Sequence, residues 1–304
     1  MKIFTTLDSI NNDRECAISL GLFDGLHKAH QAVIASAVDS GLVPAVFTFT
    51  TDGSHPASKK GFVPLMSVQD RIDGIEKLGA KLLLIPDFSE FSHLTAEEFV
   101  VDVLFGRMKA RVLCCGFDFR FGRDLGGVDL LKKLCDKHGA RLFVIDCMTE
   151  NGKTVSSSAM RKALCEGDLE TYRDMCGRYF SVNSAVIHGR KLGSKMNFPT
   201  INQPIDASIL APRFGVYASL THVDGKTYPS VTNVGTKPTV SSSETVLAET
   251  NIFGFDEELY ERRVTVELVH FLREEKKFDS VDELRLAIAT DRNLAKEFFN
   301  SKSV

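Results

Sequence analysis

Two histidines three residues apart, His27 and His30, follow a glycine-rich turn in the segment Gly21–His30, GLFDGLHKAH. The segment lies between a strand pattern and a helical pattern, so both imidazoles are expected on one face of the helix start. A helix start also offers unsatisfied N–H groups and the positive end of the helix dipole. Together these groups suit a phosphate whose charge grows during transfer. H-x-x-H alone fits two surface histidines equally well, but the strand–turn–helix context favours a nucleotide site.

Two later segments have the composition of nucleotide-binding loops. Cys115–Gly127, CGFDFRFGRDLGG, follows a strand pattern and is rich in Gly, Phe and Arg, although an ordinary strand end and loop would explain it about as well. Val155–Arg161, VSSSAMR, places three hydroxyls before a helix. Capping explains one serine, and the arginine could supply bidentate charge at a phosphate. The dinucleotide fingerprint and the P-loop are both absent, since Gly189–Lys195 has the wrong spacing and order for a P-loop.

The elements that would position these segments alternate between strand and helix over the first half of the chain. Ser67–Asp70 and Thr95–Glu98 resemble helix starts with capping residues. Five strands with four helical crossovers predict an α/β, doubly wound parallel sheet, in which ligands bind at the carboxyl ends of the strands. The expected strands cover residues 17–20, 44–49, 81–85, 111–115 and 140–146, and the expected helices cover 29–41, 67–79, 95–108 and 127–139.

After about residue 180 the pattern changes. Residues 156–178 are expected to form two short helices, and the five segments that follow are β-rich and partly alternating. Asp224-Gly225 between two of them is a hairpin signal. These strands predict a small antiparallel β-barrel, and residues 281–299 predict a C-terminal amphipathic helix. All seven cysteines precede residue 177, which supports two domains, 1–180 and 181–304.

Composition excludes several classes of protein. A chain of 304 residues is long enough for about two domains. The net charge of -3 argues against a nucleic-acid partner, and no apolar run is long enough for a membrane span. The N-terminus lacks the apolar core of a signal peptide, and the seven cysteines show no C-x-x-C pair. A cytoplasmic protein with reduced thiols is expected.

The motifs in their order resemble one family. GLFDGLHKAH, GFDFRFG and VSSSAMR resemble the adenylyltransferase module of the bacterial bifunctional riboflavin kinase/FAD synthetase family, whose fold is nucleotidyltransferase-like. The second half is similar to the flavokinase module of the same family. The resemblance covers residues 16–298, and eight motifs in family order are not easily accidental. The five motifs of the second half are NFPTIN (197–202), PRFGVYA (212–218), TNVGTKPT (232–239), LAETNIF (247–253) and LREEKKF (272–278).

The resemblance implies two ATP-dependent reactions, riboflavin to FMN and then FMN to FAD with release of pyrophosphate. His27 and His30 would stabilise the α-phosphate during adenylyl transfer. Mg²⁺ is implied as a cofactor, with riboflavin, FMN and ATP as small-molecule partners. No nucleic acid or membrane partner is implied, and the oligomeric state stays open. The residues implied to hold ATP or line the nucleotide loop are Phe23, Asp24, Gly25, Asp118, Ser158 and Arg161, the last also in a catalytic role.

In the kinase module the resemblance assigns Glu249 as the base that takes the proton from the ribityl 5′-hydroxyl, a role that suits a carboxylate. Thr200 and Asn202 would bind Mg²⁺ and the nucleotide phosphates. Without the resemblance, Glu249 would be an ordinary polar strand residue and 200–202 part of a proline-led turn. The other residues implied in binding are Gly189 and Gly193, which would let the backbone approach ADP, and Arg273.

Four positions depart from the family pattern. Ala29 replaces the glycine of H-x-G-H, and Thr48–Pro56, TFTTDGSHP, is longer than the usual T-F-x-P-H-P. Asn197 stands where a glycine precedes F-P-T, and Asn251 stands where histidine is usual. None removes a proposed catalytic side chain. Two alternatives remain: one efficient module, the kinase being favoured, or a non-catalytic flavin- or nucleotide-binding regulator. The regulator would be marked by loss of His27, His30, Arg161, Thr200 or Glu249, all of which are present.

Overall fold

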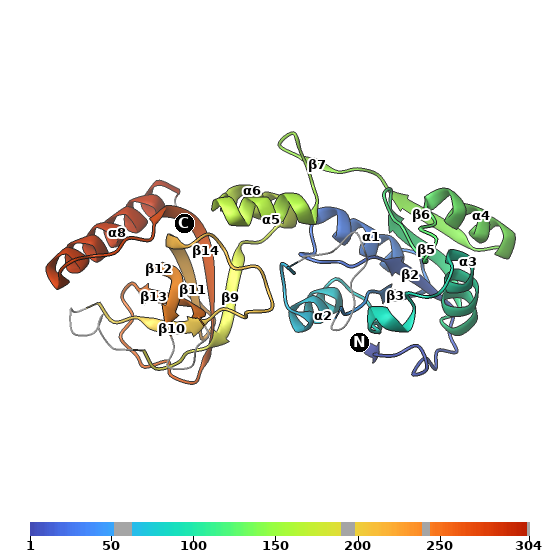
Figure 1. Cartoon of the computed structure of the whole chain (residues 1–304), viewed down its shortest axis with the longest axis horizontal. Coiled ribbons are helices and arrows are strands. Elements are labelled where there is room, and N and C mark those ends of the chain that lie inside the picture. Colours follow the sequence, from blue (N-terminus) through green and yellow to red (C-terminus); the bar gives the residue numbers. More distant parts are fainter. Residues whose placement is uncertain (52–62, 190–197, 239–243, 303–304) are drawn as a thin grey trace. The chain divides into compact units, whose positions relative to one another are not determined.

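The computed structural model describes residues 1–51, 63–189, 198–238 and 244–302. The chain forms two compact units, Met1–Ser157 and Ser158–Val304 (Figure 1). Three features singled out from the sequence, Gly193, Asn197 and most of the TFTTDGSHP segment, lie outside the described residues. Among the described helices, none combines the length and the apolarity needed to cross a membrane.

The first unit is built on a six-stranded sheet in which every pair of neighbours is parallel. The doubly wound parallel sheet predicted from the sequence is therefore confirmed, with all five expected strands. The sixth strand, β1, was not expected because its three residues are too few to show a period. In sheet order the strands are β1 (Lys2–Phe4), β4 (Leu82–Leu84), β3 (Val43–Phe47), β2 (Cys16–Leu20), β5 (Ala110–Gly116) and β6 (Arg141–Ile145).

Helices cover both faces of this sheet because successive strand residues point to opposite sides. Ile18 belongs to the core under the helices η3 and α4, whereas its neighbour Ala17 belongs to the core under α1 and α2. The expected capping by Ser67 and Thr95 is confirmed. The helix after Thr95 soon changes from α to π geometry. The helices are α1 (Lys28–Val38), α2 (Val68–Lys77), α3 (Ala96–Glu98), η3 (Phe99–Arg107) and α4 (Val128–His138), with a short turn η2 (Phe88–Glu90).

The strand order fixes where a ligand site should lie. From β2 the chain proceeds to β3 and β4 on one side, and then to β5 and β6 on the other side. The carboxyl ends of β2 and β5 are thus neighbours at the point where the order reverses. Ligands of open α/β sheets bind at such a point. The two segments that leave it are Gly21–His27 and the GFDFRFG loop.

The division into units lies before residue 180. α5 (Ser157–Glu166) and α6 (Leu169–Cys176) belong with the second unit, except for the first residue of α5. Tyr172 of α6 is buried with its ring edge-on to Phe180, 6.2 Å between centroids. The change in composition at 180 reflects where strands begin, whereas the compact unit also includes the helices packed on those strands.

The second unit is a six-stranded antiparallel sheet that closes into a near-barrel. The outer strands approach each other where Gln203 Nε2 donates to Ser184 O at 2.8 Å. Asp224 and Gly225 have φ of 48° and 76°, so the predicted two-residue hairpin is confirmed. The barrel strands are β10 (Ile201–Pro204), β13 (Glu244–Ile252), β12 (Lys226–Pro238), β11 (Gly215–Val223), β14 (Arg263–Glu274) and β9 (Phe180–Ala185). The C-terminal helix is α8 (Val281–Lys302).

Candidate functional site

The first candidate site lies at the carboxyl end of β2, where the chain turns into α1. His27 is the N-cap of α1, and its Nδ1 accepts a hydrogen bond from the His30 N–H at 3.2 Å. The two imidazole rings stack with centroids 3.5 Å apart and planes 17° apart. Phe23 meets His30 edge-on at 5.2 Å. The structure therefore brings the two histidines together on one face of the helix start, as the spacing predicts.

His27 is an uncharged hydrogen-bond donor at neutral pH. Its residue is only 6% exposed, and burial lowers its pKa from 6.5 to about 4, although the nearby Asp118 carboxylate opposes the shift. Because Nδ1 accepts the His30 N–H, the proton of the neutral ring lies on Nε2. The capping role thus fixes the tautomer and leaves Nε2–H as the donor.

Asp118 connects the first site to the second of the two neighbouring strands. It follows β5 in the GFDFRFG loop, and its charge acts on His27, which follows β2. The structure therefore places Asp118 and the histidine pair at the point where the strand order reverses. A carboxylate beside a neutral donor can receive hydroxyl groups of a nucleotide while the histidines face its phosphates.

The turn before His27 is held by a buried charge pair. Phe23, Gly25 and Leu26 all have positive φ, 57°, 79° and 43°. Asp24 is 3% exposed, and its Oδ1 accepts a hydrogen bond from Leu65 N at 2.8 Å. Burial lowers the pKa of the Arg71 guanidinium, whereas the Asp24 charge raises it. The opposite charges of Asp24 and Arg71 thus stabilise each other in the buried region beside the turn.

Arg71 was not selected from the sequence. Its side chain, 7% exposed as a residue, donates to Leu22 O and to Phe49 O, both at 2.9 Å. It therefore joins the ends of β2 and β3. The available signal was its place in the helical pattern, because Arg71 and Ile75 are four residues apart and share the buried side of α2. An arginine on an apolar stripe needs polar partners in the core.

A small hairpin supports the same turn from another direction. β7 (Thr149–Glu150) pairs with β8 (Lys153–Thr154). Lys28 Nζ forms an ion pair with Glu150 Oε2 at 2.8 Å. Just after the hairpin, Ser157 Oγ donates to Asp24 O at 2.8 Å. Ser158 and Arg161 follow on α5, in the second unit. Their assignment to ATP rests on the motif.

The second candidate site lies on three adjacent strands of the near-barrel. Glu249 on β13 stands directly opposite Asn202 on β10 and opposite Asn233 on β12. Directly opposed residues share a face of the sheet, so one carboxylate is flanked by two carboxamides. Thr200 is half-buried just before β10. Asn233 was missed because the strand register that aligns it with Glu249 is not visible in a single sequence.

The residues present fit a magnesium ion. Asn202 is 5% exposed, and its buried Oδ1 has no hydrogen-bond partner among the described residues. A Cβ built on Gly189 would lie 2.4 Å from Asn202 Nδ2, so only glycine leaves room for this amide. Mg²⁺ prefers oxygen ligands and usually keeps few protein ligands beside substrate phosphates. In the part of the chain that the structure describes, no group of three or more His, Cys, Asp or Glu could hold a metal.

Arg273 has a different environment from the other candidate residues. Its guanidinium forms a two-point ion pair with Asp291 of α8, with Nε–Oδ1 at 2.7 Å and Nη2–Oδ2 at 2.6 Å. A third bond goes to Glu274 O at 2.8 Å. Its structural role is to join β14 to the C-terminal helix. Its role in binding a nucleotide or flavin stays a prediction.

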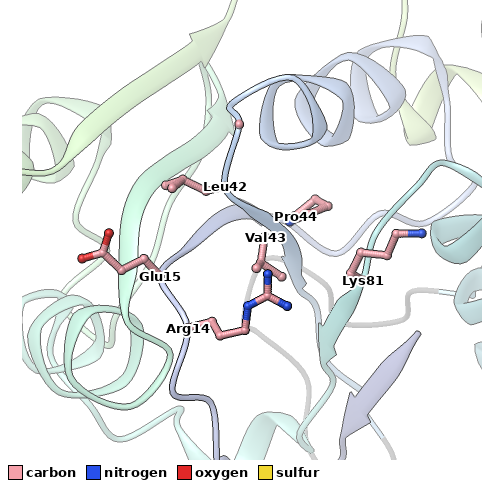
Figure 2. A pocket seen from close by; sticks show the side chains of 7 residues that line it. Arg14, Glu15, Leu42, Val43, Pro44 and Lys81 are labelled. Carbon is pink, nitrogen blue, oxygen red and sulfur yellow. The ribbon is translucent and has the colours of Figure 1, made fainter.

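Surface pockets of the first unit differ in their relation to the site. One of about 520 Å³ is lined by residues at the amino ends of β2, β3 and β4, the edge opposite to the histidines. Figure 2 shows the side chains of Glu15 and Lys81 pointing in opposite directions, so its charges do not converge. Another, of about 670 Å³, includes Phe117 and Arg120 beside Asp118, at the carboxyl edge. Neither of these two pockets is lined by His27, His30 or Asp118.

Comparison with known proteins matches both units. Residues 9–159 match the family model described as FAD synthetase, and residues 176–299 match the one described as riboflavin kinase. A Bacillus subtilis protein named bifunctional riboflavin kinase/FMN adenylyltransferase is 33% identical over 295 residues, covering 93% of this chain and 92% of the relative. An Escherichia coli protein of the same name is 32% identical over 292 residues, covering 93% of each chain.

A solved structure shares the fold over the whole length. It is described as a macrolide-efflux protein from Streptococcus pneumoniae, with a TM-score of 0.85 and 26% identity. The match covers 97% of this chain and 98% of that chain. Both units and their order along the chain are therefore common to the two proteins.

Proposed function

Since the chain belongs to the family of bifunctional riboflavin kinase/FMN adenylyltransferases, we propose that it catalyses both reactions. It phosphorylates riboflavin to FMN and adenylylates FMN to FAD, using ATP in each step. We assign adenylylation to residues 1–180 and riboflavin phosphorylation to residues 181–304. The observation that supports the proposal is that each matched segment brings candidate residues together, the stacked histidines in one and Glu249 between Asn202 and Asn233 in the other.

In adenylyl transfer a phosphate oxygen of FMN attacks the α-phosphorus of ATP, and the bond to the bridging oxygen of pyrophosphate breaks. No protein nucleophile is needed. The charge that grows on the α-phosphate is met by the His27 Nε2–H, by His30 and by the start of α1. We assign to ATP binding, by their motifs, the residues Phe23, Asp24, Gly25, Asp118, Ser158 and Arg161.

In the kinase reaction Glu249 accepts the proton of the ribityl 5′-hydroxyl, whose oxygen attacks the γ-phosphorus of ATP while ADP leaves. Asn202 and Asn233, on either side of Glu249, hold the ribityl 5′-hydroxyl and the γ-phosphate in place. Thr200 and Asn202 would hold Mg²⁺, which neutralises phosphate charge when bound. We also assign a nucleotide-binding role to Gly189, Gly193 and Arg273.

The proposed partners are small molecules: riboflavin, FMN and ATP. No nucleic acid or membrane partner is proposed. All seven cysteines are free thiols, and ATP is used in both steps, which supports a cytoplasmic location.

The test is to incubate the protein with riboflavin, ATP and Mg²⁺ and to separate the flavins by chromatography. Formation of FMN followed by FAD is expected. FMN without FAD, even when FMN is supplied, would mean that only the kinase is efficient. Neither product would support a non-catalytic flavin- or nucleotide-binding regulator.

A further inference from the structure

One arginine of the C-terminal helix contacts the part of the near-barrel that carries Thr200 and Asn202, the residues proposed to hold Mg²⁺. Arg292 of α8 is half-buried, and its Nη1 donates a hydrogen bond to Oδ1 of Asn251 on β13. Asn251 is 3% exposed and lies two residues after Glu249, so both side chains share one face of the strand. The guanidinium of Arg292 thus stands beside the row that holds the proposed base.

Asn251 passes this contact on to the segment before β10. Its Nδ2 donates to Pro199 O at 2.7 Å. The same guanidinium lies over the ring of Phe198, 5.2 Å from the centroid, and over that of Phe253, at 4.9 Å. Residues 198–200 lie outside any strand, because β10 begins at Ile201. Since no strand pairing holds residues 198–200, side-chain contacts are important for fixing their position.

The helix itself is held at this level by the residue before Arg292. Asp291 is 5% exposed and accepts two charged hydrogen bonds from Arg273 of β14. Two consecutive residues of α8 therefore contact two different strands. A helix tethered in this way provides a fixed origin for the Arg292 side chain.

We propose that Arg292 is a positioning residue of the kinase site. Through Asn251 and the ring of Phe198 it holds the turn that places Thr200 and Asn202 for Mg²⁺ and the ATP phosphates. The inference rests on the proposed function of this site. It adds that α8, which contributes none of the assigned kinase residues, sets the site's affinity for magnesium and nucleotide.

The test compares Arg292→Met with Arg285→Met in the full-length protein. Methionine keeps a long apolar side chain over the two rings and removes the hydrogen bond. Arg285 is exposed on the same helix and serves as the matched control. Riboflavin phosphorylation is measured while MgATP, free Mg²⁺ and riboflavin are varied in turn. The Kd of MgADP, measured by calorimetry without riboflavin, should rise together with the KM for MgATP. Arg292→Met should raise the KM for MgATP and the Mg²⁺ requirement by about 10-fold or more, the size of one lost charged hydrogen bond. The KM for riboflavin should stay close to that of Arg285→Met.

A double-mutant cycle with Asn251→Leu shows whether the arginine acts through the asparagine. Adding Arg292→Met to Asn251→Leu should change the KM for MgATP by less than about twofold, since the hydrogen-bonded path is already broken and methionine still covers the ring of Phe198. Full additivity would overturn the proposed path. Equal rises of KM for riboflavin and MgATP in Arg292→Met, or a variant indistinguishable from Arg285→Met, would overturn the positioning role. Absence of FMN formation by the unmodified protein would instead refute the kinase assignment itself.

Discussion

The burial of His27 makes the first unit sensitive to acid by an amount that follows from its pKa. Burial lowers that pKa from 6.5 to about 4 in the folded protein. Below pH 6.5 the unfolded chain binds a proton that the folded ring refuses. The contribution of the neutral His27 ring to the free energy of unfolding is therefore fully present above pH 6.5, and it is lost as the pH falls towards 4. The full loss is about 3 kcal/mol, of which about 2 kcal/mol is lost by pH 5.

The assay is denaturant unfolding at pH 7.5 and pH 5.0, for the unmodified protein and for His27→Asn. Asparagine is a good N-cap residue and has no titrating group, so it keeps the helix start and removes the ionisation. Other groups titrate alike in both proteins and cancel in the comparison. Between pH 7.5 and pH 5.0 the unmodified protein should lose about 2 kcal/mol more unfolding free energy than His27→Asn. The difference is expected in the unfolding transition of the first unit, which contains His27. His138→Asn, at the exposed end of α4, is the control and should follow the unmodified protein.

An equal loss of stability in the unmodified protein and in His27→Asn would mean that the ring gains its charge as easily in the folded state as in the unfolded chain. The reasoning that His27 acts as a neutral Nε2–H donor would then fail. The same reasoning requires that adenylylation of FMN show no ionisation of His27 between pH 8 and about pH 5.5. A loss of kcat/KM centred near pH 6.5 in the unmodified protein, absent from His27→Asn, would also refute it.

Four further changes test other parts of the molecule. Glu249→Gln should lower FMN formation by roughly 10²–10⁴-fold and leave FAD formation from supplied FMN nearly unchanged, whereas His30→Ala should do the reverse; loss of both products in Glu249→Gln would show that the sites are coupled or misassigned. Arg71→Met removes the buried charge that faces Asp24 and leaves the carbonyls of Leu22 and Phe49 without this donor, so calorimetry should show the first unit destabilised by about 3–5 kcal/mol, with less effect in Arg71→Lys; an unchanged transition would show that Arg71 does not support the turn. A fragment of residues 158–304 should phosphorylate riboflavin, and one of 183–304 should unfold at lower temperature because it lacks α6 and Phe180; a folded but inactive 158–304 would exclude Thr200, Asn202 and Glu249 as a sufficient set. Ala29→Gly should raise kcat/KM for FMN adenylylation at limiting ATP, leave riboflavin phosphorylation unchanged and cost about 1 kcal/mol of stability, because the position is helical; an unchanged or lower rate would mean that the site is adapted to alanine.

Local patterns predicted most of the fold because the forces they report are local. Apolar periods and capping residues fixed the central strands and the helices, including the caps at Ser67 and Thr95. β10 was missed because Pro199 lies two residues before it and Pro204 is its last residue, and proline is a turn signal in a single sequence. The change to π geometry after Glu98 was missed because α and π helices share the same residue preferences at this level.

The candidate sites divide along the same line. The meeting of His27 and His30 follows from spacing on a helix. The approach of Asp118 depends on the strand order of the folded sheet, and in the sequence Asp118 was indicated only by its motif. Arg71 and Asn233 were not predicted from the sequence, because their roles depend on which carbonyl or side chain the tertiary fold brings opposite to them. A sequence shows a buried arginine only as a charge in an apolar stripe, and it does not show strand register.

Asn251 shows how a departure from a family pattern can be read once its contacts are known. In the sequence it is a substitution two residues from the proposed base. In the structure its amide uses both ends, accepting from Arg292 and donating to Pro199. An uncharged carboxamide can do both at any pH, because it carries a donor and an acceptor that do not titrate. The residue type at position 251 is therefore explained by the partners on either side of it, and the substitution of Arg292 is the direct way to measure what that pairing contributes.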